Sequence, residues 1–146
     1  MDKNNIEIIL IEDNPNDAEL AIDALRSKKL ANNIKILKDG EEAIDFFFGS
    51  DEGDDYKMSV TPKLILLDLK LPKIGGLEVL KRLKSNKLTK KIPVVVLTSS
   101  REHTDLITSY DYGVNSYIVK PVDFVQFMNA VSDVGLYWML LNEPLT

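Results

Sequence analysis

The sequence contains no cysteine and only one histidine, His103. The lack of cysteine excludes disulfides, thiolate catalysis, thiolate zinc sites and iron–sulfur clusters, and a single histidine cannot build a multi-histidine metal site. No apolar run approaches the ~20 residues that span a bilayer, and the first residues lack the charged head and small-residue cleavage site of a signal peptide. We therefore expect a cytoplasmic protein without membrane contact, whose chemistry depends on carboxylates, hydroxyls and lysines.

Basic residues are fewer than acidic ones. The chain has 18 lysines and arginines against 23 aspartates and glutamates, a net charge of −5. A nucleic-acid-binding protein normally carries a basic face, so this balance argues against nucleic acid as a partner. The length of 146 residues fits one domain, and we expect a single domain over residues 1–146.

Short apolar runs rich in β-branched residues alternate along the chain with helical patterns. In the first helical pattern Ala18, Ala21, Ile22 and Leu25 fall on one helix face. Several runs are apolar on both faces, as in a parallel sheet covered on both sides. The sequence therefore predicts an α/β doubly wound sheet. The predicted strands are Ile6–Ile11, Ile34–Leu37, Leu64–Leu67, Val94–Leu97 and Tyr117–Val119. Helices are predicted around Ala18–Leu25, Ala43–Phe47, Leu77–Leu83 and Leu106–Tyr110, with a long fifth helix over Phe124–Leu141.

Polar side chains follow four of the predicted strands. Glu12-Asp13, Asp68, Thr98 and Lys120 stand at these strand ends. The carboxyl ends of parallel strands meet at one edge of the sheet, where ligands bind. Carboxylates crowded there repel one another unless a cation joins them, and Mg²⁺ prefers such oxygen ligands and accepts a phosphate. With a lysine and a hydroxyl opposite, the edge is suited to phosphoryl transfer.

The acidic segment Gly49–Pro62 is long for a loop in a compact domain. Its aspartates, Asp51, Asp54 and Asp55, lack the ligand spacing and the closing glutamate of an EF-hand. We expect a solvated and mobile connection there, with no metal site.

The sequence resembles the receiver domain of two-component response regulators. The resemblance covers about residues 6–131, so that about 132–146 form a C-terminal helical extension. It implies a flavodoxin-like, five-stranded parallel sheet of order 2-1-3-4-5. The features that carry it are Glu12-Asp13, Asp68-Leu69-Lys70-Leu71-Pro72 followed by Gly76, Leu97-Thr98-Ser99, Gly113 followed by Ser116-Tyr117, and Lys120-Pro121.

The resemblance also implies how the acidic residues are used. Asp68 is similar to the phosphoacceptor, which forms an aspartyl phosphate as a covalent intermediate. Glu12 and Asp13, together with Asp68 and the backbone carbonyl of Lys70, correspond to the Mg²⁺ ligands.

The remaining matched residues correspond to groups that respond to the phosphoryl group. Lys120 corresponds to the lysine that pairs with the phosphoryl oxygens, and Thr98 to the hydroxyl that moves toward them once Asp68 is modified. Tyr117 occupies the position of the aromatic side chain whose rotamer follows this movement. The resemblance further implies a cis peptide bond before Pro121.

The function implied is a stand-alone, phosphorylation-dependent switch. It would take a phosphoryl group from a sensor histidine kinase or a phosphotransfer protein and signal by protein–protein contact, without an output or DNA-binding domain. Its only catalysis would be its own phosphorylation and dephosphorylation. Lys73-Ile74-Gly75-Gly76 and the ending YWMLLNEPL resemble the stand-alone receivers associated with bacterial phytochromes, which implies a phytochrome-type kinase.

Two other functions are weighed against this one. A metal-dependent phosphohydrolase also forms an aspartyl phosphate, but it needs an acid two residues after the nucleophile, where this chain has Lys70. A phosphorylation-independent binding module on a receiver scaffold has no physical need to keep like charges together. The complete set of acids with Thr98 and Lys120 argues against it.

The predicted fifth helix is more apolar than one buried face requires. In Phe124–Leu141, 13 of 18 residues are apolar, whereas a helix that buries one face needs about three in seven. A large exposed apolar patch usually marks an interaction surface. We expect a two-fold homodimer through the fourth helix, the fifth strand and the fifth helix, with folding of the tail over its own domain as the alternative.

Overall fold

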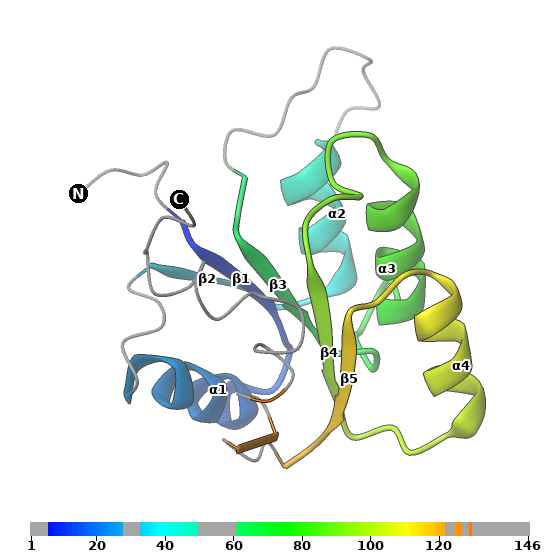
Figure 1. Ribbon diagram of the computed structural model, residues 1–146. Coiled ribbons are helices and arrows are strands. Elements are labelled where there is room, and N and C mark those ends of the chain that lie inside the picture. Colours follow the sequence, from blue (N-terminus) through cyan, green and yellow to red (C-terminus); the bar gives the residue numbers. More distant parts are fainter. Residues whose placement is uncertain (1–5, 28–32, 50–60, 122–124, 127–128, 130–146) are drawn as a thin grey trace, which may run out of the picture.

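The computed structural model describes residues 6–27, 33–49, 61–121, 125–126 and 129, and within them the chain alternates between strand and helix (Figure 1). The strands are β1 (Ile8–Ile11), β2 (Ile34–Leu37), β3 (Leu64–Leu67), β4 (Val94–Thr98) and β5 (Ser116–Val119). The helices are α1 (Pro15–Ser27), α2 (Gly40–Phe48), α3 (Gly76–Ser85) and α4 (His103–Asp111).

All five strands are parallel, and their order in the sheet is β2-β1-β3-β4-β5. This confirms the order that the sequence resemblance implied. The order reverses direction at β1, because β1 pairs with β2 on one side and with β3 on the other. The carboxyl ends of β1 and β3 therefore form the switch point, where doubly wound sheets hold their ligands.

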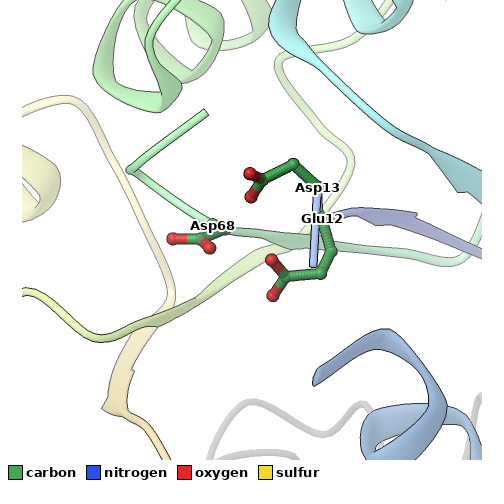
Figure 2. A group of neighbouring side chains, drawn as sticks. All are labelled: Glu12, Asp13 and Asp68. Carbon is green, nitrogen blue, oxygen red and sulfur yellow. The ribbon is translucent and has the colours of Figure 1, made fainter. Parts of the chain in front are cut away.

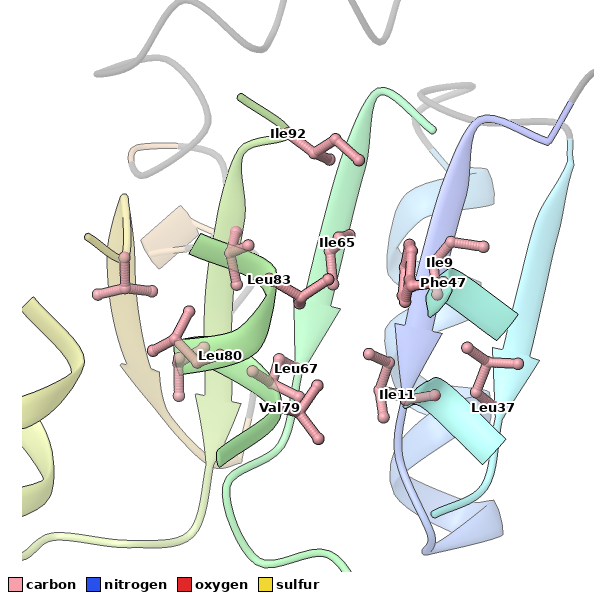
Figure 3. Packing of buried hydrophobic residues seen from close by; sticks show 14 of the residues in the cluster. Ile9, Ile11, Leu37, Phe47, Ile65, Leu67, Val79, Leu80, Leu83 and Ile92 are labelled. Atoms are coloured by element: carbon pink, nitrogen blue, oxygen red, sulfur yellow. The ribbon is translucent and has the colours of Figure 1, made fainter. Parts of the chain in front are cut away.

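The sheet separates two apolar cores. Ile8 and Leu10 of β1 pack with Ala21 of α1 on one face, whereas Ile9 and Ile11 pack against α2 and α3 on the other (Figure 3). All four residues of β1 are buried, as expected for a strand with helices on both sides. This explains the continuous apolar runs that predicted the central strands.

Polar side chains fix where the first two helices begin. Asn14 Oδ1 accepts hydrogen bonds from the backbone amides of Asn16 and Asp17, at 2.9 and 3.1 Å, at the start of α1. Asp39 Oδ1 accepts one from the amide of Glu42, at 2.7 Å, and caps α2. Both caps satisfy amides that have no partner within the helix.

The strand bounds differ from the predicted ones by at most two residues, and the helices begin and end up to three residues beyond the predicted ranges. β1 begins at Ile8 rather than Ile6, because the ladder with β2 starts where Ile8 faces Ile34. β5 begins one residue earlier than expected, at Ser116, which pairs with Val95.

Three sequence predictions concern residues outside the described ranges. They are the loop Gly49–Pro62 over positions 50–60, the fifth helix Phe124–Leu141 apart from residues 125, 126 and 129, and the extension over about 132–146. Of the helices that the structure describes, none has both the length and the apolarity to cross a membrane.

Candidate acidic phosphoryl site

Three carboxylates meet at the carboxyl ends of β1 and β3 (Figure 2). Glu12 and Asp13 directly follow β1, and Asp68 directly follows β3. One carboxylate oxygen from each lies within 4.8 Å of the other two. Glu12 and Asp68 are buried, whereas Asp13 is exposed. The structure thus brings together the three acids that the strand ends predicted.

Lys120 extends from the end of β5 into this acidic cluster. Its ammonium nitrogen Nζ contacts the Glu12 carboxylate and lies 2.9 Å from both Asp68 Oδ2 and Asp17 Oδ2. A lysine ammonium has three protons to donate, and all three have a carboxylate acceptor here. The peptide bond between Lys120 and Pro121 is cis, as the resemblance implied.

Burial and charge act in opposite directions on the two buried acids. Burial, reinforced by the neighbouring Asp68 carboxylate, raises the pKa of Glu12 to about 7 despite its hydrogen bond with Lys120. Burial alone would also raise the pKa of Asp68, but the ammonium of Lys120 and the backbone amide of Lys70 lower it below its usual value. Asp68 is therefore ionised at neutral pH, while Glu12 is near the midpoint of its titration.

Burial and hydrogen bonding also act in opposite directions on the pKa of Lys120. Burial alone would lower the pKa of Lys120, but its hydrogen bonds with Glu12, Asp17 and Asp68 outweigh burial and raise the pKa above its usual value. Lys120 is therefore a permanent cation at the centre of the cluster. Three carboxylates contact this one ammonium, and Asp13 lies beside two of them, so the acids outnumber the lysine.

The donor set fits a hard divalent cation. It consists only of carboxylate oxygens, and the three that lie within 4.8 Å of one another can converge on one ion. Burial is the main cause of the raised pKa of Glu12, and a cation at this place would favour its ionised form. For Lys70, the structure shows a backbone amide that donates a 3.0 Å hydrogen bond to Asp68 Oδ1. The carbonyl of Lys70 as a ligand stays a prediction.

Thr98 is the last residue of β4, the strand that pairs with β3. Its side chain is fully buried, and Oγ1 accepts a 3.2 Å hydrogen bond from the backbone amide of Ser100. The hydroxyl oxygen is thus joined to the loop between β4 and α4. Movement of the Thr98 side chain would therefore first alter its hydrogen bond with the Ser100 amide.

Ser100 is a centre of hydrogen bonding that sequence reasoning missed. Its hydroxyl donates to Asp105 Oδ2 at 2.5 Å and accepts from the backbone amide of Glu102 at 3.3 Å. Its carbonyl accepts a 3.1 Å hydrogen bond from the Tyr117 hydroxyl. Through these bonds Ser100 connects Thr98 with Tyr117 and with the first turn of α4.

Asp17 is a second residue that the sequence analysis did not select. It lies in the first turn of α1, where an acidic residue is ordinarily explained by the helix dipole. Its contact with Lys120 joins residues 103 positions apart in the chain. The available signal was its position four residues after Asp13, in the turn that directly follows the acidic pair.

The loop after Asp68 is held close to the site by two glycines. A Cβ on Gly76 would lie 2.3 Å from the Asp68 carbonyl oxygen, and one on Gly40 would lie 1.8 Å from the Ile74 carbonyl oxygen. Such distances are far inside van der Waals contact, so both positions require glycine. Lys73, with φ of 69°, completes the turn and pairs with Asp39 at 3.4 Å.

Comparison with known proteins identifies the family to which this fold and its acidic edge belong. The response regulator receiver domain matches residues 8–132. The chain therefore belongs to the response regulator receiver family of two-component systems, whose general function is phosphorylation on an aspartate. Divalent cations, Mg²⁺ or Mn²⁺, bind in the acidic pocket of such domains, and histidine kinases or phosphotransfer proteins are their partners.

Similar proteins include response regulators, two of which are named as phytochrome response regulators. The bacteriophytochrome response regulator AtBRR is 47% identical, with a TM-score of 0.75 over 94% of this chain and 98% of that one. Response regulator Rcp1 of Synechocystis sp. (strain ATCC 27184 / PCC 6803 / Kazusa) is 38% identical over 90% of this chain and 88% of its own length. Its Mn²⁺-bound structure has a TM-score of 0.68 at 36% identity, covering 93% and 90% of the two chains. The phosphorylated cyanobacterial phytochrome response regulator RcpA is 36% identical, with a TM-score of 0.71 over 92% and 94%.

Proposed function

We propose that this chain is a stand-alone response regulator that accepts a phosphoryl group on Asp68 in the presence of Mg²⁺. The observation that carries the proposal is the ionised Asp68 carboxylate, held by Lys120 beside two further acids at the switch point of the sheet. AtBRR is matched over 98% of its length, which supports a single receiver domain over residues 1–146 as the functional unit.

The proposed step is an in-line displacement at phosphorus. An Asp68 carboxylate oxygen forms the new bond to phosphorus while the bond from phosphorus to the donor's histidine nitrogen breaks, and that nitrogen keeps the electron pair. Glu12, Asp13, Asp68 and the Lys70 carbonyl would hold Mg²⁺, which neutralises charge on the phosphoryl oxygens. Lys120 donates to a phosphoryl oxygen in place of the Asp68 oxygen that it contacts before transfer.

The same proposal gives Thr98 and Tyr117 their roles. A phosphoryl group on Asp68 offers acceptors to the Thr98 hydroxyl, and movement toward them weakens its bond with the Ser100 amide. Because the Ser100 carbonyl also holds the Tyr117 hydroxyl, Tyr117 and the start of α4 are released together. The state of Asp68 is thereby transmitted to the surface formed by α4 and β5.

Exposed apolar side chains on that surface support an interaction site. Ile107 and Tyr110 of α4 are 48% and 49% exposed, and Val125 is 63% exposed. The proposed occupant is a second copy of this chain, in a two-fold dimer through α4, β5 and the segment after Pro121. The similarity to AtBRR and RcpA, which are named as phytochrome response regulators, favours a phytochrome-type histidine kinase as the phosphoryl donor. Such a donor would place the protein in the cytoplasm.

The alternatives are less consistent with the site. A phosphohydrolase needs an acid two residues after Asp68, and the side chain there is the exposed Lys70. In a binding module freed from phosphorylation, nothing would favour the burial of Glu12 and Asp68 side by side. The proposed protein therefore catalyses only its own phosphorylation and dephosphorylation.

Intact mass spectrometry after incubation with a small phosphodonor and Mg²⁺ tests the proposal. We expect one added phosphoryl group in the wild-type protein and in Asp23→Asn, a control on the exposed side of α1. Asp68→Asn and removal of Mg²⁺ by a chelator should both abolish the addition. Phosphoryl incorporation that persists in Asp68→Asn contradicts the assignment.

A further inference from the structure

The ammonium of Lys120 has three carboxylate partners, and the proposed reaction accounts for two of them. Asp68 is the residue that receives the phosphoryl group, and Glu12 is a proposed metal ligand. The third partner is Asp17, whose Oδ2 lies 2.9 Å from Nζ, the same distance as Asp68 Oδ2. Asp17 neither accepts the phosphoryl group nor holds the metal ion in the proposed reaction, so its contact with Lys120 has no explanation there.

The backbone around Asp17 holds its carboxylate in this place. Asn14 Oδ1 accepts the amides of Asn16 and Asp17, so the first turn of α1 is fixed where the chain leaves β1. The amide of Asn14 in turn donates a 3.2 Å hydrogen bond to Glu12 Oε2. The loop from Glu12 to Asp17 is thereby closed by its own polar groups, and it presents two carboxylates to Lys120.

The three partners also differ in what phosphorylation does to them. Asp68 loses its negative carboxylate when one of its oxygens bonds to phosphorus, so its attraction for Lys120 passes to the phosphoryl oxygens. Glu12 would be shared between Lys120 and the metal ion. Neither step uses the Asp17 oxygens, so phosphorylation leaves this partner of Lys120 chemically unchanged.

Lys120 needs such an anchor because of its position. It comes from β5, which is separated from β3 by β4, so its side chain must span the edge of the sheet to reach Asp68. A lysine side chain has four rotatable bonds, and holding it extended costs conformational entropy unless its ammonium has a partner. The side chain of Lys120 is nevertheless only 11% exposed, whereas that of its partner Asp17 is 36% exposed.

We propose that Asp17 is a positioning residue that anchors the Lys120 ammonium beside Asp68 before and after phosphoryl transfer. The inference rests on the proposed function and adds a residue to its site. Without the Asp17 carboxylate, the Lys120 side chain samples more conformations, and the fraction of molecules with Nζ in place for the phosphoryl oxygen falls.

A double-mutant cycle on phosphorylation rate tests the anchor. In the wild-type background, Asp17→Asn should slow phosphorylation by a small phosphodonor about fivefold or more, the size expected for residues in direct contact. Asp17→Glu should restore part of the rate, since it keeps the charge, and Asp23→Asn on the same helix should leave the rate unchanged. In a Lys120→Ala background, Asp17→Asn should have no further effect, because the group that it positions is gone.

A second readout does not depend on phosphorylation. In protein labelled with ¹³C and ¹⁵N at lysine, Asp17→Asn should shift the Lys120 Cε and Nζ signals and increase their mobility, while Asp23→Asn leaves them unchanged. A shift of the Lys120 signals together with a wild-type protein that takes up no phosphoryl group would retain the anchor and overturn the proposed function. Equal rate losses from Asp17→Asn in both backgrounds, or unchanged Lys120 signals, would overturn the anchor itself.

Discussion

Lys120 and Lys84 are two half-buried lysines whose surroundings have opposite electrostatic character. Lys120 faces the carboxylates of Glu12, Asp17 and Asp68, and its pKa is raised. Lys84, on α3, donates to the backbone carbonyls of Lys90 and Ile92 at 3.2 and 2.8 Å. Within the described residues no carboxylate pairs with Lys84, and burial lowers its pKa.

The difference separates a structural lysine from a functional one. Lys84 closes the connection between α3 and β4 by satisfying carbonyls that would otherwise lack a partner, which any neutral donor of similar length could do. Lys120 holds together acids that repel one another, and even so the acids outnumber it. An excess of like charge at a strand edge lowers stability and is retained where function needs it. Burial alone therefore does not identify the site, whereas burial with unbalanced charge does.

The largest expected effect comes from removing each ammonium in turn. Lys120→Met should lower the free energy of unfolding by about 3 kcal/mol, because it leaves buried carboxylates without their counter-charge. Lys84→Met should lower it by at most about 1 kcal/mol, since only neutral carbonyls lose a donor. Urea unfolding at neutral pH without metal measures both. Equal losses of unfolding free energy in the two variants would contradict the electrostatic difference between Lys120 and Lys84.

The pH dependence of stability should distinguish Glu12 from the rest of the cluster. Its pKa is raised from 4.5 to about 7, so its contribution to stability is fully present below pH 4.5 and is lost as pH rises through 7. The loss should be on the order of 2–3 kcal/mol, and Glu12→Gln should remove it. The pKa of Asp68 is lowered from 3.8, so its contribution is lost only as pH falls below that value and does not overlap with this window.

Unfolding midpoints at pH 4.5 and pH 8, in the presence of a chelator, provide the measurement. We expect the difference in stability between wild-type protein and Glu12→Gln to change across this range. A constant difference would contradict the raised pKa of Glu12.

A smaller effect is expected for metal affinity. Asp13→Asn should weaken Mg²⁺ binding about tenfold, because it takes one charged oxygen from a hard cation, whereas Asp23→Asn should leave it unchanged. Titration of Mg²⁺ followed by calorimetry at pH 7 measures this, and binding should release protons as Glu12 ionises. Wild-type affinity in Asp13→Asn would exclude this carboxylate from the metal site.

Much of this arrangement could be predicted from the sequence, because a residue that follows a parallel strand lies at a known edge of the sheet. Glu12, Asp13, Asp68 and Lys120 stand at strand ends, and parallel strands end at a common edge, so their location at one edge followed from the strand predictions alone. The strand order itself came from the family resemblance, since the apolar runs do not state which strand pairs with which.

The contacts that the sequence did not predict depend on the direction in which loop side chains point, and the hydrophobic pattern carries no information on this. Asp17 points at Lys120 because Asn14 fixes the first turn of α1, and an acid in a first turn is ordinarily a dipole effect. The Ser100–Asp105 bond depends on the path of the loop between β4 and α4. The carbonyls that Lys84 meets depend on the path of the chain before β4. In each case the loop geometry, rather than the residue type, decides the contact.

The central claim is that the carboxylate held by Lys120 receives the phosphoryl group, and chemical trapping tests it directly. The protein is incubated with a small phosphodonor and Mg²⁺ and then reduced with borohydride, which converts an aspartyl phosphate to homoserine. Peptide mass spectrometry should then find homoserine at position 68 and at no other aspartate. Homoserine at another position, or a phosphoryl group that survives reduction unchanged, would contradict the account.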